Sequence, residues 1–107
     1  TVGLVTNIYD NVDRVCDRLD ITNLLDFSVT SKEVQSEKPH PPIFLSALSK
    51  AGVNACETIH VGDQYNSDVI GAQAVGITPI LIDRFNLISE GDDFKKITGL
   101  MEVIQLL

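Results

Sequence analysis

The residues best suited to chemistry follow an apolar segment in the middle of the chain. Gly62 and Asp63 come directly after residues 58–61, a short segment expected to form a strand, and Asp68 stands five positions beyond Asp63. Two carboxylates at the end of a strand suit a hard cation, because Mg²⁺ prefers an octahedral shell of oxygen ligands that includes waters. The alternative is an acidic turn in which Asp68 caps the following helix.

Two other segments carry groups suited to binding a phosphate. Lys38 precedes Pro39 and a helical pattern, where its ammonium can neutralise carboxylates and phosphate oxygens. Thr6 and Asn7 end the first apolar segment, where a hydroxyl, an amide and backbone N–H groups form a phosphate cradle. A solvated surface lysine and a simple helix cap are the alternatives for these residues.

Short runs of Val, Ile and Leu alternate with helical patterns, which is typical of an α/β fold with a parallel sheet. We expect strands at residues 2–5, 27–30, 58–61 and 78–82. Helices are expected at residues 9–19 with Asn7 as N-cap, from Pro41 to Gly52, at 68–74, and at 97–106, where Ile97, Leu100, Met101 and Ile104 would face inward. Residues 31–36 are expected to form a polar turn, and residues 90–93 a polar segment.

Four strands joined by helices predict a single open sheet. Ligands of such sheets gather at the carboxyl ends of the strands, which directs attention to Thr6, Thr30, Gly62 and Asp83.

The composition indicates one globular domain over residues 1–107, with 44% apolar and 21% charged residues. Fifteen acidic residues against eight basic ones give a net charge of -7, which argues against a nucleic-acid partner. No apolar run is long enough to cross a bilayer, so no membrane partner is expected. Cys16 and Cys56 lack metal-site spacing and are expected to be reduced thiols in the cytoplasm.

Taken in order, Leu4-Val5-Thr6-Asn7, Lys38-Pro39 and Gly62-Asp63 with Asp68 resemble the second, third and fourth motifs of the haloacid dehalogenase superfamily. The resemblance covers essentially the whole chain, including residues 72–77 and 81–84. It is strongest to the phosphoglycolate-phosphatase-like branch, which places a helical cap between the first and second motifs. The resemblance implies a three-layer α/β/α Rossmann-like core with a mostly parallel sheet and a Mg²⁺ cofactor.

The resemblance also assigns roles to the residues. Thr6 would hydrogen-bond the transferring phosphoryl group of a small phosphorylated metabolite, with Asn7 in the same cradle, and Lys38 would neutralise charge on the nucleophile and phosphate. Asp63 would hold Mg²⁺, and Asp68 would orient the metal shell or Lys38. The acidic Gly-Asp motif is similar to that of the phosphatases and unlike that of the true dehalogenases.

Two departures from the family pattern stand out. The first motif, Asp-x-Asp, supplies the nucleophile and the general acid, and it does not occur in these 107 residues. We therefore expect a partial core domain, motifs II to IV, without the nucleophile strand and cap, and inactive alone. His40 replaces the Asp that relatives often place at the helix entry, which predicts a weaker cap; His40 and His60 are interpreted as structural or exposed.

Two other functions remain open. One is a non-catalytic α/β module that binds an anion or a metal. The other is a structural half-domain that associates in trans, by self-association or by pairing with the missing N-terminal segment.

If the central nucleophile strand is absent, unpaired backbone groups should lower stability or promote self-association. Sedimentation and calorimetry test this expectation. A monomer with a high melting temperature would contradict it.

Overall fold

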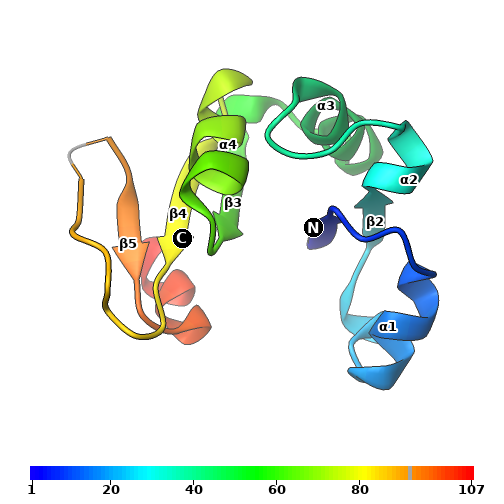
Figure 1. Ribbon diagram of the computed structural model, residues 1–107, viewed down its shortest axis with the longest axis horizontal. Coiled ribbons are helices and arrows are strands. Elements are labelled where there is room, and N and C mark those ends of the chain that lie inside the picture. Colours follow the sequence, from blue (N-terminus) through cyan, green and yellow to red (C-terminus); the bar gives the residue numbers. More distant parts are fainter. Residues whose placement is uncertain (92) are drawn as a thin grey trace. The chain divides into compact units, whose positions relative to one another are not determined.

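The computed structural model describes residues 1–91 and 93–107. Asp92, which the sequence placed in a polar segment, lies outside the described residues. The chain divides into two compact units, Thr1–Asn54 and Ala55–Leu107, and each is described by itself (Figure 1). None of the described helices combines the length and the apolar character needed to cross a membrane.

The first unit is built on a parallel strand pair. Strand β1 (Gly3–Thr6) is followed by α1 (Val12–Arg18), the 3₁₀ helix η1 (Thr22–Leu24) and β2 (Phe27–Thr30). The register pairs Gly3 with Phe27 and Thr6 with Thr30, so both strands end at the same edge. That edge is where the sequence placed the phosphate cradle.

Helices α2 (Ser31–Val34) and α3 (Pro41–Ala51) complete the first unit. Pro41 and Pro42 occupy the first turn of α3, where proline needs no backbone N–H partner, and Gly52 ends the helix with a φ of 68°. The inward face of α3 buries Ile43, Phe44 and Ala47, as expected. His40 makes no side-chain cap hydrogen bond, in agreement with the weak cap expected there.

Two local expectations in the first unit are wrong. Asn7 does not cap α1; Asn11 does, because its side chain accepts hydrogen bonds from the backbone N–H groups of Asp13 and Arg14. The helix consequently begins three residues later than expected. Residues 31–34 form the helix α2 rather than a turn, since the Thr30 hydroxyl caps its first turn by accepting from Glu33 N–H at 3.1 Å.

The second unit contains a three-stranded parallel sheet in the order β3-β4-β5. Its core packs Ile80, Ile82 and Ile97 against the half-buried Ile59, Val61 and Val103. Figure 1 shows α4 beside β3 and β4, with β5 at the outer edge. The elements in chain order are η2 (Ala55–Glu57), β3 (Ile59–Gly62), the π-helical turn η3 (Tyr65–Ile70), α4 (Gly71–Ala74), β4 (Thr78–Ile82), β5 (Lys95–Ile97) and the 3₁₀ helix η4 (Leu100–Leu106).

The helix expected at residues 97–106 is present only in part, as the 3₁₀ helix η4 (Leu100–Leu106). Ile97 belongs to β5, where pairing with β4 buries it. The backbone N–H groups of Thr98 and Gly99 both donate to the Glu102 carboxylate, which starts η4 at Leu100. Leu100, Met101 and Ile104 are more than half exposed rather than inward-facing.

The fold class is confirmed, because the protein is an α/β chain whose paired strands all run parallel. In the described residues the strands form two sheets instead of the single sheet expected. The difference arises because a segment's apolar pattern identifies a strand but does not name its neighbour. That residues 1–107 act as one domain stays a prediction.

Candidate active site

The acidic loop lies at the carboxyl end of β3. Gly62 is the last residue of the strand, and Asp63 follows it with an exposed side chain. The helical segment begins at Tyr65, so Asp68 lies within η3 rather than at the helix start that the sequence suggested. The two predicted metal ligands therefore have different surroundings.

Asp68 is buried, with only 3% of its side chain exposed. One carboxylate oxygen, Oδ2, accepts a hydrogen bond from the backbone N–H of Gln64 at 3.0 Å. The other, Oδ1, lies 2.9 Å from Nε2 of His60, a half-buried residue of β3. Asp68 thus ties the strand, the loop and the helix together through one carboxylate.

Gly62 allows this close approach. A Cβ atom added at this position would overlap Cβ, Cγ and Oδ2 of Asp68. Even alanine therefore cannot fit unless Asp68 moves. The glycine of the Gly-Asp pair is thus required by the space that the Asp68 carboxylate occupies.

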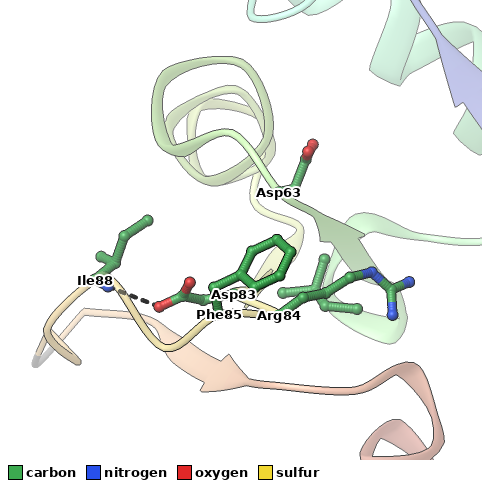
Figure 2. Close-up of a pocket in the computed structure, with 6 residues that line it drawn as sticks. Asp63, Asp83, Arg84, Phe85 and Ile88 are labelled. Atoms are coloured by element: carbon green, nitrogen blue, oxygen red, sulfur yellow. Dashed lines mark hydrogen bonds between the residues drawn. The ribbon is translucent and has the colours of Figure 1, made fainter.

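A pocket of about 210 Å³ opens beside the loop, at the carboxyl end of β4. Its lining residues are Asp63, Ile82, Asp83, Arg84, Phe85 and Ile88. Figure 2 shows Asp63 directed away from Asp83, whose carboxylate instead turns toward Ile88. The two acids therefore do not converge on one point in this pocket.

Asp83 organises the loop that follows β4. Its carboxylate accepts the backbone N–H of Ile88 at 2.7 Å, and the ammonium of Lys96 on β5 lies 3.7 Å away. Hydrogen bonds from the backbone of Ile88, and then of Leu87, lower the pKa of Asp83, and Lys96 acts in the same direction. These bonds explain why an acid at this strand end is nearly buried.

In the first unit, Asn7 holds Lys38. The Asn7 side chain accepts the backbone N–H of Lys38 at 2.8 Å and donates to the Lys38 carbonyl at 3.2 Å. This two-way clamp fixes the backbone of Lys38 beside the end of β1, where Thr6 is half-buried. The structure thus brings Asn7 and the backbone of Lys38 together, and the Asn7 amide is itself engaged by the protein.

Thr6, Asn7 and Lys38 belong to the first unit, and Asp63 and Asp68 belong to the second. Their meeting in one pocket stays a prediction. Over residues 1–91 and 93–107, no three His, Cys, Asp or Glu side chains gather as a metal-holding group. Of the two acids of the loop, Asp63 is exposed enough to contact a metal directly, whereas Asp68 is buried.

Sequence reasoning missed the parts played by His60 and Gly62. A signal was present, because residues two apart on a strand share a face, and both lie on the face to which Asp68 returns. The return of Asp68 against that face depends on the η3 turn, which the spacing of the residues does not predict. Histidine in a strand was accordingly interpreted as structural or exposed.

Parallel strands that end in an acidic loop define an α/β protein with its polar site at the carboxyl edge of the sheet. The profile of the haloacid dehalogenase-like hydrolase family matches residues 1–82. The chain belongs to this hydrolase family, which confirms the resemblance in its motifs.

Relatives of this chain include phosphatases. Haloacid dehalogenase-like hydrolase domain-containing protein 3 of Danio rerio is 33% identical over 82 residues, 77% of this chain and 34% of that protein. Glyceraldehyde 3-phosphate phosphatase of Methanothermobacter thermautotrophicus is 37% identical over 79 residues, 74% of this chain and 35% of that protein. The chain thus spans about a third of the length of the curated relatives it matches.

The fold also matches that of a dehalogenase. The crystal structure of 2-haloacid dehalogenase from Pseudomonas syringae superposes with a TM-score of 0.88 at 28% identity, covering 99% of this chain and 45% of that one. Fold similarity therefore extends over nearly the whole chain, and the chemistry must be argued from the site.

The substitution Gly62→Ala should lower the free energy of unfolding by about 1–3 kcal/mol, because the new methyl group displaces the Asp68 carboxylate. Urea denaturation measures the change. Gly99→Ala is the matched control, since a Cβ there meets nothing within 4 Å. Equal effects of the two substitutions would contradict the packing described here.

The pKa of Asp83 lies below its ordinary value of 3.8. The carboxylate therefore stabilises the fold fully above the unfolded-state pKa, and this contribution is lost as pH falls through the lower folded-state pKa. Asp83→Asn should be less stable than the unaltered protein at neutral pH, and the gap should narrow below pH 3.8. Urea denaturation across this range, with the exposed Glu90→Gln as control, tests the prediction; a gap independent of pH would refute it.

Proposed function

We propose that this chain supplies the magnesium- and phosphate-binding residues of a phosphohydrolase that acts on small phosphate monoesters. The observation that carries the proposal is the braced acidic loop, which presents an exposed Asp63 at the carboxyl end of β3. Two relatives, a ribulose-1,5-bisphosphate 5-phosphatase and a glyceraldehyde 3-phosphate phosphatase, are named as phosphatases and support phosphate-ester hydrolysis as the reaction.

The donor set suits Mg²⁺ as a partial site. The exposed carboxylate of Asp63 is a hard oxygen ligand, and the buried Asp68 orients the loop that carries it. The remaining oxygen ligands would be waters, the substrate phosphate and groups outside those described. The bound ion would polarise the phosphoryl oxygens and offset their charge.

The phosphate side of the site would come from the first unit. Thr6 would donate its hydroxyl to the phosphoryl group, and Asn7 would hold Lys38 through the backbone clamp. The Lys38 ammonium would then neutralise the charge of the phosphate and the attacking carboxylate. The proposal requires this set to face Asp63 in the complete protein.

Turnover also requires a nucleophile. The 107 residues contain no Asp-x-Asp, so we expect this chain alone to bind phosphate and metal without forming an aspartyl-phosphate. The chain covers only about a third of its curated relatives, and the proposal assigns the nucleophile to sequence beyond it. The cytoplasmic location expected from the cysteines stays a prediction.

Carbon–halogen cleavage is the main competing reaction, given the similarity in fold to 2-haloacid dehalogenase. The acidic Gly62-Asp63 pair favours phosphate-ester hydrolysis, because a carboxylate that holds Mg²⁺ serves phosphoryl transfer. The non-catalytic module remains the alternative of a different class.

Asp63→Asn should weaken Mg²⁺ binding to the complete protein by at least about tenfold, because it removes a direct ligand. Titration calorimetry measures the affinity. Glu90→Gln removes an equal charge from an exposed position in the same unit and should leave the affinity unchanged.

Activity completes the test. The 107-residue chain should not hydrolyse p-nitrophenyl phosphate, whereas the chain joined to a segment that bears the nucleophile should. A complete protein that binds Mg²⁺ but leaves a broad panel of phosphoesters untouched would contradict the enzyme assignment and favour the binding module.

A further inference from the structure

We propose that His60 is a positioning residue for Asp63, acting through the carboxylate of Asp68. The inference deepens the proposed function and rests on it, because Asp63 is the residue assigned to the metal. Asp68 on this account orients the acidic loop and does not contact the ion directly.

The His60–Asp68 contact has the geometry of a charge-assisted hydrogen bond. The atoms Nε2 and Oδ1 are 2.9 Å apart, and the side chains are 13% and 3% exposed. An ionised carboxylate only accepts hydrogen bonds, so Nε2 carries the proton in this contact. Both the neutral Nε2–H tautomer and the imidazolium provide this donor, and the bond therefore does not depend on the charge of His60.

The Asp68 carboxylate touches the residues on both sides of Asp63. It packs against the bare Cα of Gly62, and it accepts the backbone N–H of Gln64. Asp63 is the single residue between these two anchors, so its backbone has little freedom. The direction of its Cα–Cβ bond, and hence of the exposed carboxylate, follows from the position of Asp68.

His60 supplies a further restraint on that position. Its ring reaches Asp68 from β3, the strand that Gly62 ends, and β3 is held by its parallel pairing with β4 from Ile59 to Gly62. The acidic loop is thus connected to the sheet in two ways. The backbone joins it to β3, and the His60 side chain joins it through Asp68. Groups that hold and orient the ligands of a metal commonly set its affinity in this way.

The buried His60–Asp68 pair could also serve only to stabilise the fold. The test therefore separates the local conformation of the loop from the global stability of the chain. The variants of the 107-residue chain are His60→Leu, which removes the donor, and His60→Gln, whose side-chain amide can replace Nε2–H. Asp68→Asn serves as a second route should His60→Leu fail to fold. Val61→Ala is the control, because Val61 lies on the opposite face of β3 and packs in the core.

The first readout is amide hydrogen exchange at Gln64, measured by NMR and corrected for global stability. We expect faster exchange in His60→Leu and Asp68→Asn, recovery in His60→Gln, and no change in Val61→Ala. Exchange at Gln64 that is the same in His60→Leu as in Val61→Ala would overturn the proposal, as would a failure of His60→Gln to recover protection.

The second readout is Mn²⁺ affinity, followed by paramagnetic broadening near Asp63. His60→Leu should lower it about tenfold, the lower end of losses seen when a group that orients metal ligands is removed. Equal Mn²⁺ binding by the unaltered chain and Asp63→Asn would refute the proposed metal function, whereas the Gln64 exchange would still decide whether His60 positions the loop. Unchanged affinity in a His60→Leu chain whose unaltered form binds through Asp63 would overturn the positioning role.

Discussion

The carboxylate of Asp68 is the point on which the candidate site depends. It fills the space that a side chain at residue 62 would take, and it bonds the Gln64 backbone and the His60 ring. A buried carboxylate is costly unless its oxygens find donors, so the surroundings and the acid require one another. These contacts restrain the loop after β3 on both sides of the exposed Asp63.

In the first unit, a neutral side chain, that of Asn7, restrains the backbone. The Asn7 side chain satisfies the backbone N–H and carbonyl of Lys38, and so joins the end of β1 to the segment before α3. An amide suits this task because it both donates and accepts, whereas a carboxylate only accepts. In each unit a short polar side chain bonds the backbone of the segment that carries a residue assigned to chemistry: Asn7 bonds that of Lys38, and Asp68 bonds that of Gln64 next to Asp63.

In the second unit, Asp83 has a structural role, whereas Asp63 is the acid assigned to function. Asp83 is held by backbone N–H groups and by Lys96, which also binds the carbonyl of Ile88. Its role is to shape the loop beside the pocket, although it stands at a strand end where ligands usually gather. Asp63 has the exposure that a metal ligand needs, so two acids at neighbouring strand ends have different roles because their partners differ.

The sequence by itself determined the α/β class, the family, and elements whose signals are local. Strand β4, the prolines that begin α3 and the glycine that ends it were predictable because each depends on nearby residues. Strand β5 was not, since its three residues become a strand only by pairing with β4. The His60–Asp68 contact was hidden for the same reason: the residues stand eight positions apart, and only the η3 turn brings their side chains together. Features that depend on neighbouring residues could therefore be predicted from the sequence. Contacts between residues distant in the sequence were decided by the tertiary structure, because they form only when the chain folds.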